Sequence, residues 1–200
     1  MTQNGDGEMS SMDAGSGVGF SHYRFDRLSV MVIDDNRHML NLISEILRGL
    51  SIRAITKLTD PADAFKEMSV VPVDLLIVDY AMPMLNGIEF AQLVRSGGDS
   101  PDVFVPIIMV TGYSDALTVQ NARDAGVTEF LAKPISARAL YRRILEVINN
   151  PRPFVRCTGF FGPDRRRHDV PFEGPDRRVE PPSEEGGGKA RLYPTQFMDV

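Results

Sequence analysis

Several residue types are scarce in this sequence, and their scarcity limits what the chain can be. Only one cysteine, Cys157, occurs in 200 residues, so neither an intramolecular disulfide nor a cysteine-based zinc site can form. No apolar run approaches the roughly 20 residues that span a bilayer. Residues 1–21 lack the basic start and the apolar stretch of a secretory signal. The net charge of −5 gives no bulk attraction to nucleic acid or to an anionic membrane. These absences favour a cytoplasmic protein without a membrane segment.

The remaining composition is sufficient for one domain with an extension at each end. An apolar share of 42% supports one sizeable core. Residues 1–24 are mostly small or polar and are predicted to be a disordered leader. The glycines at 15–19 precede the first predicted strand, which argues against a nucleotide-binding loop. Residues 25–150 form the predicted domain. Residues 151–200 form a Pro-, Gly- and Arg-rich tail without a recognisable output domain.

Within the predicted domain, short β-type apolar runs alternate with segments of helical periodicity. The predicted strands are Leu28–Ile33, Ile52–Lys57, Val73–Asp79, Val105–Thr111 and Thr128–Ala132. A predicted helix follows each strand, and the helices begin near Asn36, Asp60, Asn86, Asp115 and Ser136. Five such repeats predict a parallel sheet with helices on both faces. The expected architecture is a flavodoxin-like (βα)5 doubly wound fold with strand order 2-1-3-4-5 and flexible N- and C-terminal extensions.

Polar side chains stand where four of the predicted strands end. They are Asp34 and Asp35, Asp79, Thr111 and Lys133. Strands one, three, four and five are neighbours in the expected order, so these side chains should line one crevice. Three carboxylates that repel one another demand a cation, and Mg²⁺ prefers oxygen ligands. With a lysine and a hydroxyl nearby, the pocket suits an aspartyl phosphate.

Here a resemblance to a known family becomes specific. Residues 27–150 resemble the receiver domain of two-component response regulators (CheY-like), in a stand-alone form with an Arg-rich C-terminal tail. The motifs that carry the resemblance are Asp34-Asp35, Asp79 with Met82-Pro83 and Asn86-Gly87, Thr111-Gly112, and Lys133-Pro134. The resemblance implies phosphorelay signalling, in which a histidine kinase or histidine phosphotransfer protein phosphorylates the chain in the presence of Mg²⁺. It implies a phosphoprotein that switches an interaction face for an unknown downstream protein, and not a turnover enzyme.

The resemblance also assigns roles to individual residues. It makes Asp79 the phospho-acceptor and gives Mg²⁺ the ligands Asp34, Asp35, Asp79 and the backbone carbonyl of Ala81. Lys133 would pair with the phosphoryl oxygens, and Thr111 would donate a hydrogen bond to one of them.

Three further positions take their roles from the same resemblance. Phe130 would be the aromatic switch, whereas Ala81 and Tyr113 would modulate the lifetime of the phosphate. Pro134 implies a cis peptide after Lys133. The fourth helix, fifth strand and fifth helix would form the output face, which could also hold a homodimer together.

The tail contains a duplicated motif, which is Gly-Pro-Asp-Arg-Arg at 162–166 and again at 174–178. A solvated, disordered tail is the simplest interpretation. Arginine pairs on a rigid turn also suit a partner protein, an anionic ligand or the acidic face of the domain itself. Interspersed acids count against nucleic acid.

Two rival functions remain to be weighed. The chain could be a receiver-like binding module that acts through its Arg-rich tail without phosphorylation. It could also be an enzyme of the haloacid-dehalogenase type, which phosphorylates a strand-end aspartate. That class needs an acidic residue two positions after the nucleophile, and Ala81 occupies this position here.

Overall fold

A five-stranded parallel sheet forms the centre of the molecule. The computed structural model describes residues 25–113, 115–157 and 159–165. The strands lie in the order β2-β1-β3-β4-β5, and every neighbouring pair is parallel. Their bounds are β1 Ser29–Ile33, β2 Ala54–Leu58, β3 Leu75–Asp79, β4 Ile107–Thr111 and β5 Glu129–Ala132. The flavodoxin-like prediction and its strand order are therefore confirmed.

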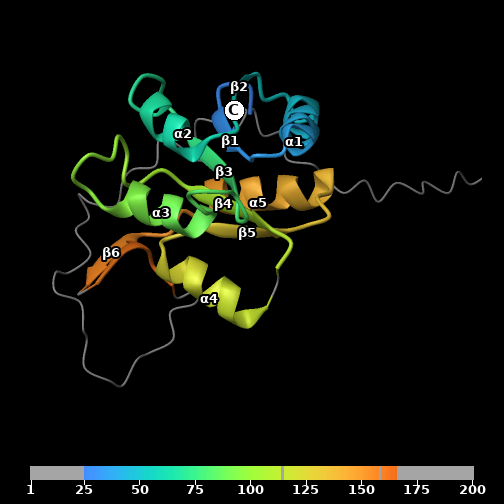
Figure 1. Cartoon of the computed structure of the whole chain (residues 1–200). Helices are drawn as coiled ribbons and strands as arrows, with labels where there is room; N and C mark the ends of the chain where they lie inside the picture. The colour runs from blue at the N-terminus through green and yellow to red at the C-terminus, as the bar shows by residue number, and fades with distance from the viewer. Residues whose placement is uncertain (1–24, 114, 158, 166–200) are drawn as a thin grey trace, which may run out of the picture.

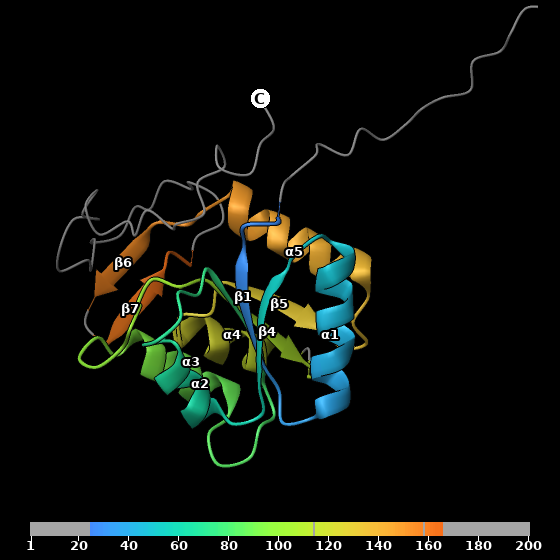
Figure 2. The same ribbon diagram turned by 90° about the horizontal axis from the view of Figure 1, so that it is seen from above.

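Helices cover both faces of this sheet. Their bounds are α1 Arg37–Gly49, α2 Pro61–Glu67, α3 Gly87–Arg95, α4 Ala116–Asp124 and α5 Ala137–Asn149. Figure 2 shows α1 and α5 on one side of the sheet and α2, α3 and α4 on the other. Figure 1 shows the same helices arranged around the strands. The arrangement is that of a doubly wound α/β domain.

Two cores result because successive side chains of a strand point to opposite faces. In β1, Val30 and Val32 join the core beneath α1 and α5. The alternate residues Met31 and Ile33 join the core beneath α2, α3 and α4. The central strands β3 and β4 are buried along their whole length, as is expected of parallel strands covered on both faces.

The helices begin where the sequence supplies capping side chains. The Asn36 carboxamide oxygen accepts from the backbone N–H groups of His38 and Met39 at the start of α1. At the start of α3, Asn86 and Glu89 form a capping box, in which each side chain accepts from the backbone N–H of the other residue. These caps fix the two loops that follow β1 and β3.

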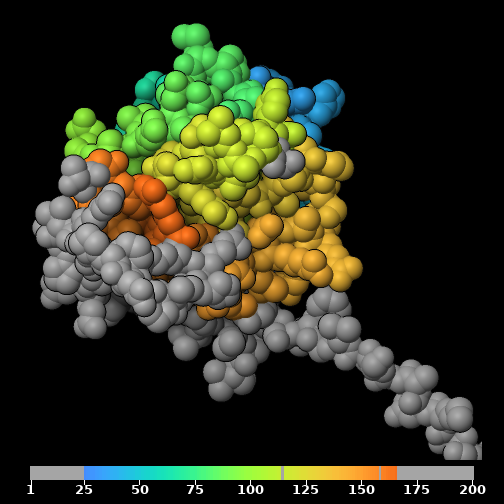
Figure 3. Space-filling model, turned by 90° about the horizontal axis from the view of Figure 1, so that it is seen from below, coloured from blue at the N-terminus to red at the C-terminus, as the bar shows by residue number. Residues whose placement is uncertain are grey.

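The first part of the predicted tail is folded, which the sequence did not predict. Residues Phe154–Cys157 and Phe160–Pro163 form an antiparallel hairpin, β6 and β7. It lies beside α3 and α4 in Figures 1 and 2, and Figure 3 shows its surface continuous with that of α4. The flexible extension expected from residue 151 therefore does not apply to this hairpin.

Aromatic rings and a buried arginine attach the hairpin to the domain. The rings of Phe154 and Phe161 lie 5.2 and 5.6 Å from the ring of Phe104, measured between centroids. The Arg95 guanidinium stacks on Phe154 at 5.1 Å and donates to the backbone carbonyls of Val103, Val105 and Gly126. Burial lowers the pKa of Arg95 to about 9. These contacts connect the hairpin to the end of α3 and to the loop before β4.

Two further arginines hold the hairpin to α4 and β5. Arg152 lies 2.7 Å from the buried carboxylate of Glu129, which also pairs with Arg143 of α5 at 3.0 Å. Arg165, in the first copy of the duplicated motif, pairs with Asp124 at 2.7 Å and stacks on the ring of Phe160 at 4.0 Å. The described part of the first copy is therefore bound to its own domain through Arg165.

Several predictions concern residues outside the described ranges. These residues include the leader at 1–24 and the second motif copy at 174–178. Among the described residues, no helix is long and apolar enough to cross a membrane.

Candidate functional site

Three carboxylates meet at the carboxyl ends of β1 and β3. Asp79 is the last residue of β3, and Asp34 and Asp35 follow β1 directly. One carboxylate oxygen from each lies within 4.8 Å of the others. Asp34 and Asp79 are buried, with exposed fractions of 1% and 4%, whereas Asp35 is exposed. The parallel sheet brings them together because neighbouring strands end at the same edge.

Asp34 stands in an unfavourable environment for a charge. Its Oδ1 accepts from the backbone N–H of Asn36 at 2.8 Å. Its Oδ2 is buried and has no hydrogen-bond partner among the described residues. Burial raises the pKa of Asp34 above its ordinary value, and the charge on Asp79 raises it further. The Asn36 N–H and the charge on Lys133 oppose this shift only in part.

Lys133 supplies the positive charge of the site. It follows β5, and its Nζ lies 2.7 Å from Asp79 Oδ1 and 3.8 Å from Asp34 Oδ2. The other Asp79 oxygen, Oδ2, accepts from the backbone N–H of Ala81 at 3.0 Å. The peptide between Lys133 and Pro134 is cis, as the resemblance implied.

Thr111 is the last residue of β4, which pairs with β3, but its hydroxyl bonds to the backbone of Tyr113 and not to Asp79. The hydroxyl donates to the backbone carbonyl of Tyr113 at 3.0 Å and accepts from the Tyr113 N–H at 2.9 Å. Phe130, one strand further along the sheet, is half-buried and packs against the core beneath α2, α3 and α4. Tyr113 is exposed over 58% of its surface, and Ala81 is also exposed.

A glycine allows the loop after β3 to pack against the end of that strand. A Cβ on Gly87 would lie only 2.4 Å from the backbone oxygen of Asp79. The Gly87 N–H donates to the backbone oxygen of Tyr80 at 3.0 Å. The Asn-Gly pair that carries part of the resemblance thus has two separate duties, since Asn86 caps α3 and Gly87 permits this approach.

The donor set fits a hard divalent cation. Three carboxylates crowd together, and one buried oxygen has no hydrogen-bond partner in the described part of the chain. Mg²⁺ prefers such oxygen ligands and keeps several waters or phosphate oxygens beside them. Asp34, Asp35 and Asp79 could therefore hold it. An ion there would offset the repulsion between the carboxylates.

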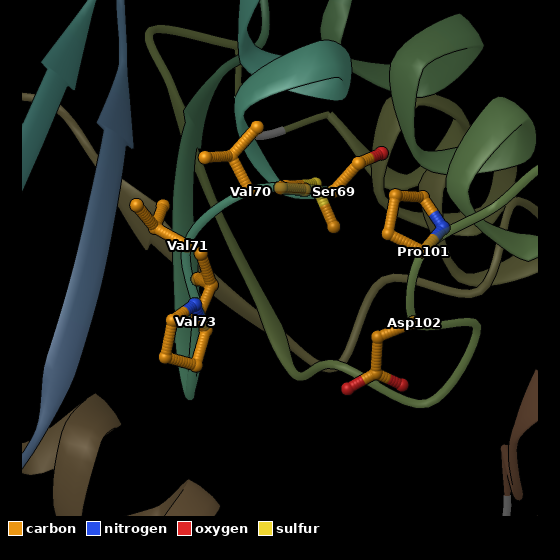
Figure 4. Close-up of a pocket in the computed structure, with 8 residues that line it drawn as sticks. Ser69, Val70, Val71, Val73, Pro101 and Asp102 are labelled. Carbon is orange, nitrogen blue, oxygen red and sulfur yellow. The ribbon is translucent and has the colours of Figure 1, made fainter.

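A second hollow, away from the three carboxylates, is lined mainly by apolar side chains. Residues 68–73, with Pro101 and Asp102, line a space of about 440 Å³ beneath the loops that precede β3 and β4. Figure 4 shows the side chains of Val70, Val71 and Val73 on one side of it and Pro101 and Asp102 on the other. Because these loops precede the strands, the pocket lies at the opposite edge of the sheet from Asp79.

Comparison with known proteins identifies the class that this fold and site define. The chain belongs to the response regulator receiver domain family, whose model matches residues 30–145. This membership places it in two-component signalling.

Individual relatives then show how far the similarity extends. The probable chemotaxis protein CheY of Rhizobium etli is 32% identical over 111 residues, which are 56% of this chain and 84% of that protein. CheY1 of Helicobacter pylori is 30% identical over 122 residues, which are 60% of this chain and 96% of that protein. The cyclic di-GMP phosphodiesterase response regulator RpfG of Xanthomonas campestris is 33% identical over 117 residues, or 58% of this chain. The chain spans only 30% of RpfG and 19% of RcaC from Microchaete diplosiphon.

Solved structures agree with this family. Vibrio cholerae CheY4 is 25% identical with a TM-score of 0.55, and the match covers 60% of this chain and 98% of CheY4. The receiver domain of the sensor histidine kinase PA1611 from Pseudomonas aeruginosa is 27% identical with a TM-score of 0.52. That match covers 60% of this chain and 94% of the receiver domain, whose structure contains a magnesium ion in the active site cleft.

The structure adds contacts that sequence reasoning missed. One is the ring of Tyr80, which lies 5.7 Å from the ring of Tyr113, between centroids, in an edge-to-face arrangement. Another is the pair between Arg152 and Glu129. No local pattern predicts either contact, because each joins segments that only the folded sheet brings together.

Proposed function

We propose that this chain is a phosphorelay receiver that accepts a phosphoryl group on Asp79. The observation that supports this most strongly is the placement of Asp79, which is buried among two other carboxylates with Lys133 Nζ at 2.7 Å. A buried nucleophilic carboxylate that pairs with a cation suits transfer of a dianionic group.

In this mechanism an Asp79 carboxylate oxygen attacks phosphorus in line with the bond that breaks. The donor is a phosphohistidine of a kinase or phosphotransfer protein, so a P–N bond breaks, an O–P bond forms and imidazole leaves. Lys133 pairs with the equatorial oxygens in place of its present contact with Asp79. Asp34, Asp35, Asp79 and the carbonyl of Ala81 would hold Mg²⁺, which would supply positive charge beside the transferring group.

The new dianion would then change the state of the domain. Thr111 would exchange its bonds to the Tyr113 backbone for a bond to the phosphoryl group, and Phe130 would turn into the space that Thr111 leaves. A local change of charge would thereby bias a two-state element. We assign output to the face formed by α4, β5 and α5, which would bind a downstream protein or a second copy of the chain. Ala81 and Tyr113 would modulate the phosphate lifetime, and the signal would act in the cytoplasm.

The alternative is a binding module that acts through the Arg-rich tail without phosphorylation. Arg165 of the first motif copy already pairs with Asp124 and stacks on Phe160, within its own domain. This contact favours an intramolecular role for the first copy and so weakens the alternative.

One experiment separates these functions. The full chain is incubated with Mg²⁺ and acetyl phosphate, and intact mass is recorded. We expect an adduct of about 80 Da that is stable in acid and lost in base, and its absence in Asp79→Asn. Asp74→Asn is the matched control, since Asp74 also borders β3 but accepts from Ser29 N–H at the other end of the strand. If the wild-type chain forms no adduct, or if Asp79→Asn still forms it, the proposed function is wrong.

A further inference from the structure

Two tyrosines that follow adjacent strand ends contact each other beside the acceptor. Tyr80 comes directly after Asp79, and Tyr113 lies two residues after Thr111. Their ring centroids are 5.7 Å apart, with an angle of 62° between the ring planes. Tyr80 is half-buried and packs against the core beneath α2, α3 and α4, whereas Tyr113 is largely exposed. The exposed ring is therefore supported by a ring that is anchored in the core.

The backbone of Tyr80 is fixed on both sides. Its N–H donates to the Val110 carbonyl at 2.8 Å, and its carbonyl accepts from the Gly87 N–H at 3.0 Å. These bonds tie Tyr80 to β4 on one side and to the start of α3 on the other. Tyr80 is thus held at both its N–H and its carbonyl, and its ring limits where the Tyr113 ring can lie.

The backbone of Tyr113 in turn occupies the hydroxyl of Thr111. The hydroxyl donates its single hydrogen to the Tyr113 carbonyl and accepts from the Tyr113 N–H. A threonine hydroxyl has one hydrogen to donate. It cannot donate to a phosphoryl oxygen while it donates to Tyr113, so the bond to the Tyr113 carbonyl must break before Thr111 can donate to a phosphoryl group.

We propose that Tyr80 is a positioning residue that sets how readily Thr111 is released, because its ring holds Tyr113 in the arrangement that binds the Thr111 hydroxyl. This inference rests on the proposed function, since release of Thr111 matters only if Asp79 carries a phosphoryl group. A ligand that requires released Thr111 shifts the population toward that state and binds more tightly when release is easier.

The size of the effect follows from the contact itself. An edge-to-face aromatic pair changes an equilibrium by about two- to tenfold beyond the burial of its area. Loss of the Tyr80 ring should therefore raise the population with released Thr111 by about two- to tenfold. The affinity for a phosphoryl mimic should rise by the same factor, because that mimic binds the released state.

The first test needs no phosphoryl group. Hydrogen exchange of the Tyr113 backbone amide is measured by NMR in the full chain, because this amide donates to the Thr111 hydroxyl in the arrangement that we propose the Tyr80 ring holds. We expect exchange to be about two- to tenfold faster in Tyr80→Leu and unchanged in Tyr80→Phe, which keeps the ring. Tyr141→Leu is the matched control, since it removes a similar edge-to-face pair with Phe25, whose centroids are 6.0 Å apart, on the other face of the sheet.

The second test uses beryllofluoride with Mg²⁺ as the phosphoryl mimic. We expect Tyr80→Leu and Tyr113→Leu each to tighten its binding, and the double variant to show less than the sum of the two effects, since both remove one contact. Unchanged amide exchange in Tyr80→Leu, or a change equal to that in Tyr141→Leu, would overturn the inference. Failure of the wild-type chain to bind the mimic would instead count against the proposed function, and the exchange test would still decide the role of Tyr80.

Discussion

Asp34 offers a test in which the metal-free and metal-bound proteins should respond in opposite directions. Asn at this position keeps an oxygen that can accept from the Asn36 N–H, as Asp34 Oδ1 does at 2.8 Å. It removes the negative charge of the carboxylate, whose other oxygen, Oδ2, is buried and has no hydrogen-bond partner in the described part of the chain. Asp34→Asn should therefore stabilise the metal-free fold and weaken the binding of Mg²⁺.

The magnitude follows from the distances around Asp34. Its repulsion with Asp79, at no more than 4.8 Å, is at least about 3.5 kcal/mol at an effective dielectric constant near 20. Its attraction to Lys133 Nζ, at 3.8 Å, is about 4.4 kcal/mol on the same scale. These two terms nearly cancel, so burial decides the sign, as the raised pKa of Asp34 indicates. We expect Asp34→Asn to gain about 1–2 kcal/mol in metal-free unfolding free energy.

The pH dependence has a definite sign. An acid whose pKa is raised on folding binds its proton more tightly in the folded state. Its contribution to stability therefore falls as the pH rises from the ordinary value of 3.8 through the raised folded pKa. The unfolding free energy of the metal-free wild-type chain should therefore fall over this pH range. That of Asp34→Asn should not show this fall.

The assay is urea unfolding of the full chain in EDTA and in Mg²⁺. At a hundred times its dissociation constant, Mg²⁺ should add about 2.7 kcal/mol to the wild-type chain and little to Asp34→Asn, so the order of stability reverses. Asp63→Asn serves as the control, because it makes the same charge change at an exposed site on α2. The reasoning is refuted if Asp34→Asn is less stable than wild type in EDTA, or if Mg²⁺ stabilises both equally.

Two further predictions concern the scaffold. Gly87→Ala should lose about 1–3 kcal/mol in urea unfolding because its Cβ would lie 2.4 Å from a backbone oxygen, whereas Gly49→Ala, with nothing within 4 Å, should lose nothing. An equal response of the two glycines would contradict this account. Arg152→Gln should lose about 3 kcal/mol because the Glu129 carboxylate is buried. Arg165→Gln should lose less than about 1 kcal/mol because both members of its ion pair are exposed. Equal losses in the two arginine variants would count against burial as the deciding factor.

Much of the fold and the charged cluster could be predicted from the sequence. Apolar runs and helical patterns give the order of elements, and the rules for parallel sheets then give the strand order. Once that order is known, Asp34, Asp79 and Lys133 are expected at one edge of the sheet, because β1, β3 and β5 all end there. The structure brings these three together, with Lys133 Nζ 2.7 Å from Asp79.

Contacts between side chains could not be predicted in the same way. The hydroxyl of Thr111 lies at the expected strand end, but it bonds to the Tyr113 backbone. That choice depends on the conformation of a loop, and strand periodicity carries no information about it. The contact between Tyr80 and Tyr113 likewise depends on how two loops meet after the sheet has formed.

The hairpin was missed for a reason that its composition explains. Gly162 and Pro163 lie in β7, and both residue types are uncommon within strands. The strand forms because Gly162 allows close approach, since a Cβ there would lie 2.8 Å from the Cα of Gly126. A signal was nevertheless present, because Phe154 and Phe161 lie in a segment that otherwise has the composition of a tail, and disordered segments contain few aromatic residues.

The hairpin also bears on how this receiver could be recombined with other proteins. The family match ends at residue 145, yet Phe104, Arg95 and Glu129 each contact groups contributed by residues 152–161. A fusion joined at residue 150 would leave an aromatic ring uncovered and remove one of the two arginines from a buried carboxylate. The part of the chain that can be exchanged as one unit therefore extends at least to Arg165, where the last described contact with α4 is made.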